Sequence, residues 1–124
     1  SLGLITLNAL TASTDIIIPL VSEVLPFKGL TMINDFINMV KRKLNPNVSI
    51  LGILITRWES SKLSKGIEEK LRGALGETVF ATKVRKNIRL AEAPLESRNI
   101  LDYDKNSNGA KDYMLFTEEF LGRI

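Results

Sequence analysis

The chain contains neither cysteine nor histidine among its 124 residues. Without cysteine it has no disulfide framework and no thiolate chemistry, and without histidine it lacks the commonest general base and metal ligand. These absences exclude Ser-His-Asp and Cys-His nucleophilic sites built from this chain alone, together with the usual zinc sites. No apolar run approaches the roughly 18 residues of a membrane span, and no charged leader precedes a hydrophobic segment. We therefore expect a cytoplasmic protein.

The composition is that of a folded domain, with 44% hydrophobic and 25% charged residues, which excludes global disorder. The net charge of +3 is unevenly distributed, because residues 57–89 hold nine lysines and arginines against four glutamates, a local net charge of +5. A basic segment of this kind can bind a polyanion, and a solvated face of mixed charge is the alternative.

The hydrophobic pattern predicts an α/β fold with parallel strands. Short β-branched runs that are apolar on both faces are typical of strands covered by helices on both sides, and their alternation with amphipathic helices indicates right-handed crossovers. Three strands form a thin sheet, so the chain is interpreted as one edge of a larger doubly wound sheet. The predicted strands cover residues 15–21, 50–56 and 78–84, and the predicted helices cover residues 2–12, 27–44, 63–75 and the region from 108 onward, after an irregular stretch. The last helix presents its predicted apolar face at Ala110, Tyr113, Met114, Thr117, Phe120 and Leu121.

Four segments, in order along the whole chain, resemble the ParA/MinD family of partitioning ATPases, and its ParA/Soj type in particular. Residues 1–10 (SLGLITLNAL) resemble the family segment SLGLLTLNAL, which directly follows the Walker B motif. Residues 87–94 (NIRLAEAP) resemble NVRLSEAP. Residues 18–29 and 103–113 match the family's IPV..E.....G and YDPKSKGAEAY segments at fewer positions. Each match alone is weak, and the four together are specific.

The resemblance implies a SIMIBI-type P-loop NTPase fold of which residues 1–124 are a single C-terminal fragment. No G-x-x-x-x-G-K-[ST] motif is present, so the groups that bind phosphate and Mg²⁺ would precede this chain. We therefore expect ATP and Mg²⁺ to be cofactors of the full-length parent, an ATP hydrolase. For the chain alone we expect neither tight nucleotide binding nor hydrolysis, and we assign it no catalytic residue and no metal ligand.

The resemblance places one side of the nucleotide pocket on this chain. In the family the loop after the third predicted strand packs beside the base, which implies a cofactor-binding role for Val84, Arg85 and Lys86, with Thr56 and Arg57 at the end of the preceding strand. Arg85 departs from the pattern, because the family has proline in this position. The alternatives are a solvated basic loop and an ordinary threonine at the end of a strand.

The resemblance also implies an ATP-dependent homodimer that binds DNA without sequence preference. Lys86 and Arg89 follow the third strand, and Lys62 and Lys65 lie near a position where the family contacts the DNA backbone; a solvated helix face is the alternative for these two lysines. The implied function is plasmid, chromosome or mobile-element partitioning, with nucleoid association and a ParB-like protein that stimulates hydrolysis. Two alternatives are a non-catalytic binding or scaffold domain and a MinD-like positioning ATPase. The second is disfavoured because residues 118–124 do not form a basic membrane-binding helix.

Overall fold

The computed structural model describes residues 2–124; Ser1, the first residue of the SLGLITLNAL segment, lies outside the described residues. Helices and strands alternate along the chain as the sequence predicts. The elements are α1 (Leu4–Thr11), β1 (Asp15–Val21), α2 (Phe27–Lys43), β2 (Ser49–Trp58), α3 (Lys62–Leu75), a 3-10 turn (Gly76–Thr78), β3 (Val79–Arg85), α4 (Ile88–Glu92), a second 3-10 turn (Ala93–Glu96), α5 (Ile100–Tyr103) and α6 (Asn108–Arg123).

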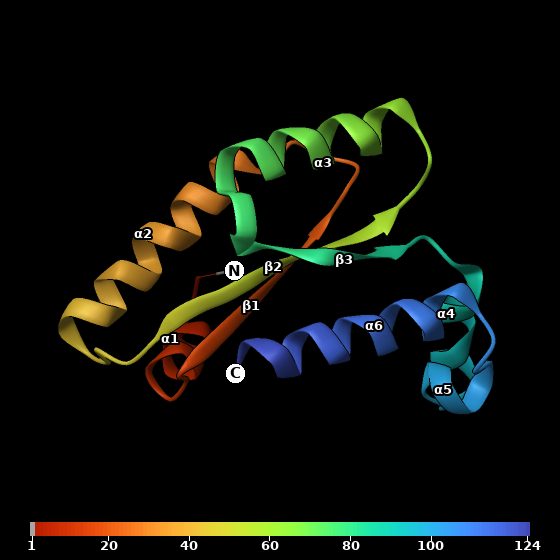
Figure 1. The fold of residues 1–124 in the computed structure, drawn as a ribbon. Helices are drawn as coiled ribbons and strands as arrows, with labels where there is room; N and C mark the ends of the chain where they lie inside the picture. Colours follow the sequence, from red (N-terminus) through yellow and green to blue (C-terminus); the bar gives the residue numbers. More distant parts are fainter. Residues whose placement is uncertain (1) are drawn as a thin grey trace.

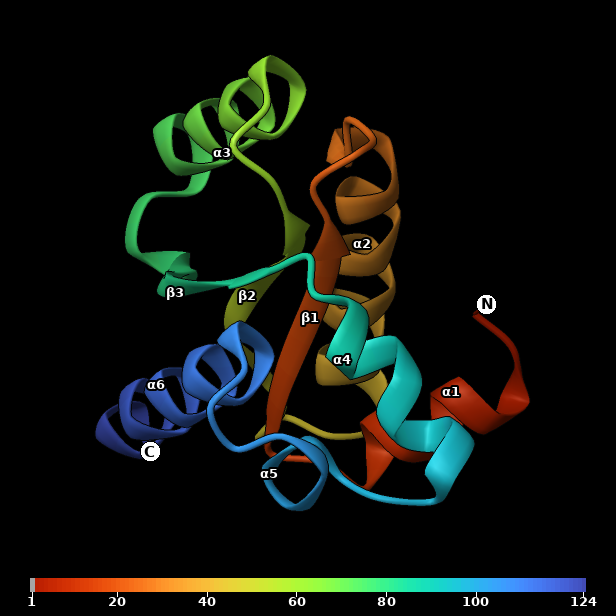
Figure 2. The ribbon, with the colours of Figure 1, turned by 90° about the vertical axis from the view of Figure 1, so that its right-hand side faces the viewer.

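The three strands form one sheet in the order β1-β2-β3, and both strand pairs are parallel. Figure 1 shows α2 and α3 on one face of this sheet and α6 on the other, and Figure 2 shows the same layers after a quarter turn. The predicted fold class, an α/β arrangement in which a parallel sheet of three strands has helices on both faces, is confirmed.

The core lies on both faces of the central strand β2. Ile53 and Ile55 pack with Ile67 and Leu71 of α3, whereas Leu54, between them, packs with Phe80 and Val84 on the opposite face. Alternate residues of a strand point to opposite faces, so an apolar run is required where both faces are covered. A third cluster joins the end of α2 to half-buried leucines of α1.

The prediction of an irregular stretch after β3 is wrong, because it contains two short helices. Asn87 caps α4 by accepting a hydrogen bond from the Arg89 N–H, and Asn99 caps α5 by accepting one from the Asp102 N–H. Helices of four and five residues are too short to show a hydrophobic period, so their caps were the only local signal.

The predicted apolar face of α6 is only partly buried. Ala110 is buried and Phe120 is half-buried, as predicted, but Tyr113 and Met114 are exposed. In their place Asp112 is buried and Glu119 is half-buried. The Ala81 and Thr82 N–H groups of β3 donate hydrogen bonds to the Glu119 carboxylate at 2.7 and 2.8 Å. β3 lies at the edge of the sheet and its free N–H groups need acceptors. The polar side chains of α6 therefore turn toward the sheet.

Candidate functional site

The carboxyl ends of the three strands surround a cavity of about 390 Å³. This is the position at which open α/β sheets bind ligands, and the volume lies within the range of about 300–1,000 Å³ for small-molecule sites. The five residues predicted to bind the nucleotide all line this cavity. Its walls are formed by Pro19, Thr56, Arg57, Val84, Arg85, Lys86, Asn87, Leu90, Ala91 and Tyr113.

The end of β2 is held in place by hydroxyl groups that the sequence analysis missed. The Ser22 hydroxyl donates to the Arg57 carbonyl oxygen at 3.0 Å and lies 3.0 Å from the Ser64 hydroxyl. The Thr56 hydroxyl donates to the Leu20 carbonyl oxygen at 3.1 Å, so its oxygen retains only acceptor capacity toward the cavity. Arg57 has a φ of +53°, a strained conformation for a residue other than glycine. The register between β2 and β3 shifts between Ile55 and Trp58, so β2 is irregular at the cavity rim.

The end of β3 is fixed by an ion pair between Arg85 and the buried Asp112 of α6. The Asp112 carboxylate accepts hydrogen bonds from the Arg85 backbone N–H at 2.9 Å, from its Nε at 3.0 Å and from a terminal guanidinium nitrogen at 2.9 Å. The hydrogen bonds to Asp112 raise the pKa of Arg85. Because its guanidinium is engaged by α6, Arg85 contributes to the cavity mainly by holding its wall.

Asp112 was missed because a single acidic residue in an amphipathic helix is usually exposed. One signal was available: Asp112 and Glu119 lie seven residues apart, which is about two helical turns, so both face the same side. The structure places both of these carboxylates against β3.

Lys86, in the loop after β3, and Arg89, in α4, are each paired with carboxylates. Lys86 lies 3.4 Å from Glu59, and Arg89 lies 3.2 Å from Glu92 and 3.4 Å from Asp104. All of these side chains are substantially exposed, so the pairs are weak and can exchange for another anion.

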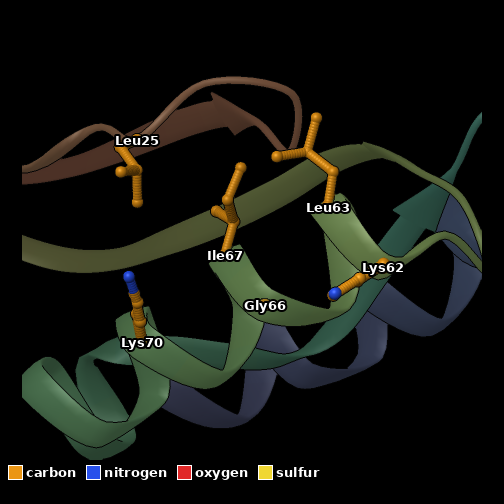
Figure 3. A pocket seen from close by; sticks show the side chains of 6 residues that line it. All are labelled: Leu25, Lys62, Leu63, Gly66, Ile67 and Lys70. Atoms are coloured by element: carbon orange, nitrogen blue, oxygen red, sulfur yellow. The ribbon is translucent and has the colours of Figure 1, made fainter.

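The structure places Lys62 and Lys65 on α3, apart from the cavity at the strand ends. Both are exposed, and within residues 2–124 neither forms an ion pair. Lys62 instead borders a second cavity, between α3 and the connection from β1 to α2 (Figure 3). The four residues predicted to bind DNA are therefore divided between α3, which holds Lys62 and Lys65, and the segment after β3, which holds Lys86 and, in α4, Arg89.

No group of three or more Asp or Glu side chains in residues 2–124 is arranged to hold a metal ion. No helix in this range is long and apolar enough to cross a membrane.

The sequence is similar to a known family and to several curated proteins. Residues 1–50 match the family model described as an AAA domain. The chain is 37% identical over 124 residues to the chromosome partitioning protein ParA of Myxococcus xanthus, covering 99% of this chain and 44% of that protein. It is 35% identical over 125 residues to the chromosome-partitioning ATPase Soj of Thermus thermophilus, covering 100% of this chain and 50% of that protein. The chain thus spans about half the length of these relatives.

The fold is similar to a solved structure that contains a nucleotide. Cobyrinic acid a,c-diamide synthase from Mycobacterium smegmatis, with bound ADP and magnesium, superposes with a TM-score of 0.76 at 28% sequence identity. The match covers 98% of this chain and 43% of that one.

Proposed function

Because this chain is a homologue of the ParA/Soj partitioning ATPases, we propose that it forms the base-side wall of the ATP site in an enzyme of that kind. The supporting observation is the convergence of Thr56, Arg57, Val84, Arg85 and Lys86 on one cavity at the carboxyl ends of the strands. The bound ADP and magnesium in the similar synthase agree with a nucleotide ligand for this fold.

The residues of the cavity fit a nucleotide base better than they fit its phosphates or a metal ion. Pro19, Leu90 and Tyr113 offer apolar surface against which a flat ring can pack. The Thr56 oxygen accepts hydrogen bonds, which suits the exocyclic amino group of adenine. In such an enzyme ATP would be the molecule that is hydrolysed. We place the groups that would hold its phosphates and Mg²⁺ in the part of the relatives that this chain does not span.

Filling the cavity tests this assignment directly. Ala91 lines the cavity, and we expect Ala91→Phe in the full-length protein to weaken ATP and ADP binding at least tenfold, because the added ring occupies the space of the base. Ala74→Phe is the matched control, since Ala74 is exposed on α3 and lies outside this cavity. Fluorescent-nucleotide titration measures both variants. Equal affinities for the two variants would refute the assignment.

We further propose that the full-length protein acts in DNA partitioning as an ATP-dependent homodimer that binds DNA without sequence preference and is stimulated by a ParB-like partner. The names of the relatives in M. xanthus and T. thermophilus support the partitioning role. Lys65 carries an unpaired charge on α3, and the ion pairs of Lys86 and Arg89 are exposed enough to exchange for phosphate. These features support a DNA surface that contains Lys62, Lys65, Lys86 and Arg89.

The salt dependence of the affinity for DNA distinguishes a surface that contacts phosphates from one that contacts only solvent. Each lost phosphate contact should reduce the slope of log affinity against log salt by about 0.9. We expect Lys65→Ala, Lys86→Ala and Arg89→Ala each to weaken binding equally on unrelated duplexes. Lys111→Ala, on the other face of the sheet, should have no effect. If the slope of log affinity against log salt is unchanged in all three variants, the DNA surface lies elsewhere or the protein is a non-catalytic scaffold domain.

A further inference from the structure

A second cavity, of about 460 Å³, opens between α3 and the connection from β1 to α2. Figure 3 shows Leu25 entering it from the connection, while Leu63 and Ile67 point toward it from α3. In the same view the amino group of Lys70 points into this space, and Lys62 lies at the other end of the helical face. We call this region the α3 groove; it is lined by Leu25, Lys62, Leu63, Gly66, Ile67 and Lys70.

The α3 groove is mainly apolar, and no part of residues 2–124 covers it. Ile67 is only 2% exposed and belongs to the core, so it forms a fixed floor. Leu25 and Leu63 are each 56% exposed above it. Gly66 keeps the helix face open, because nothing lies within 4 Å of a Cβ at that position. Exposed apolar side chains around a recess of this kind are typical of interaction sites.

The charged residues that line the α3 groove are both lysines. Lys62 and Lys70 form no ion pair within the described range, 2–124. Glu23 pairs with Arg57, Glu59 with Lys86, and Glu68 with both Arg72 and Lys83. Glu69, next to Lys70 on α3, is exposed and does not line the groove. Lys62 and Lys70 therefore present positive charges that pair with no carboxylate beside leucine side chains.

We propose that the α3 groove binds an acidic amphipathic protein segment, in which leucine-like side chains enter the recess and adjacent carboxylates pair with Lys62 and Lys70. This proposal does not rest on the nucleotide site, which lies at the ends of the strands. The lysines alone would attract any polyanion, but DNA has no apolar side chains to place against Leu25, Leu63 and Ile67.

A second copy of the chain and a membrane surface fit the groove less well. In a two-fold dimer through this face each groove would meet its own copy, so that unpaired lysines would face unpaired lysines. A bilayer contacts apolar side chains that protrude, whereas Ile67 lies at the bottom of a recess.

Two labelled synthetic peptides test the proposal on the full-length protein. The first is an 18-residue helical peptide with leucines along one face and glutamates beside them; the second has lysines in place of the glutamates. By fluorescence anisotropy we expect the acidic peptide to bind, and the basic peptide to bind at least tenfold more weakly. The charge reversal Lys62→Glu with Lys70→Glu replaces two attractive contacts by two repulsive ones, so it should reduce binding of the acidic peptide about tenfold or more.

The apolar part of the site is tested by Leu63→Ser, for which we expect at least a fivefold loss. The matched control is Lys105→Glu with Lys111→Glu, which changes the net charge equally on exposed residues outside the groove and should leave peptide affinity within twofold. All substituted side chains are exposed, so circular dichroism should show an unchanged fold.

Four results would overturn the proposal. They are absence of acidic-peptide binding, equal binding of both peptides, a loss in the control variant as large as in the groove variant, and binding that Leu63→Ser leaves unchanged. A shift in the sedimentation of the protein alone on Leu63→Ser would identify a second copy as the occupant. Binding to vesicles with anionic headgroups that is lost in the groove variants would identify a membrane surface instead.

Discussion

Replacing Asp112 by alanine is expected to lower the free energy of unfolding of this chain by about 2 kcal/mol. The carboxylate is 6% exposed and accepts three hydrogen bonds from Arg85, two from the guanidinium and one from the backbone N–H. Hydrogen bonds to charged groups contribute about 1.5–3 kcal/mol, and a buried donor that loses its acceptor adds to that loss. Breaking a fully buried ion pair would cost about 3–5 kcal/mol.

The expected loss of about 2 kcal/mol is smaller than that for a fully buried ion pair because Arg85 is partly exposed. Its side chain is 42% exposed, so after the substitution the guanidinium is hydrated again and most of the charge penalty disappears. What remains is the loss of the buried acceptor for the Arg85 backbone N–H and of the bond that fixes the end of β3 to α6. Asp112→Asn keeps one acceptor oxygen and should cost only about 1 kcal/mol.

Urea unfolding followed by far-ultraviolet circular dichroism measures these differences, and a double-mutant cycle with Arg85→Ala isolates the pair. We expect a coupling energy of about 1–2 kcal/mol between Arg85 and Asp112, within the range for residues in contact. Lys111→Ala, the neighbouring exposed position on α6, is the control. If Asp112→Ala costs no more than this control, or if the coupling is close to zero, the ion pair does not stabilise the wall of the candidate nucleotide cavity.

Three further predictions concern the sheet. Gly52→Ala should destabilise the chain by about 1–3 kcal/mol in urea unfolding, because a Cβ there would lie 2.5 Å from the Phe80 ring; Gly73→Ala, with nothing within 4 Å, is the control and should not destabilise it. Burial raises the pKa of Glu119, but the hydrogen bonds from Thr82 and Ala81 together with the charge of Arg123 lower it further, so the net pKa lies below the ordinary 4.5. The contribution of Glu119 to the free energy of unfolding is therefore present above about pH 4.5 and is lost as the pH falls through the folded pKa. In Glu119→Gln, the free energy of unfolding should fall less steeply between pH 6 and pH 3 than in the unsubstituted chain. An equally steep fall in both would contradict this prediction. Within residues 2–124, β1 pairs with β2 only, so its free edge should make the isolated chain self-associate at micromolar concentration; a stable monomer in sedimentation would show that this edge needs no partner.

The strands and long helices could be predicted because their signals are local. Apolar runs such as residues 50–56 and the three-to-four-residue spacing from Leu30 to Val40 encode burial directly. Gly76 marks the end of α3 with a φ of +55°, a conformation that glycine adopts without strain. The short helices α4 and α5 could not be found in this way, because one turn of helix shows no period.

The hydrophobic pattern was enough to predict the parallel α/β class and the succession of the three strands, and the family resemblance implied which loops line the candidate nucleotide cavity. Periodicity and motifs are properties of neighbouring residues. The packing of the folded chain was needed to show that Asp112 and Glu119 face the edge of β3, that Arg85 is held by α6, and that Leu25 and Lys70 border one groove. The physical reason is that hydrogen-bond acceptors, ion-pair partners and uncovered apolar surfaces depend on which segments distant in sequence pack together, and one chain's residue pattern does not specify those contacts.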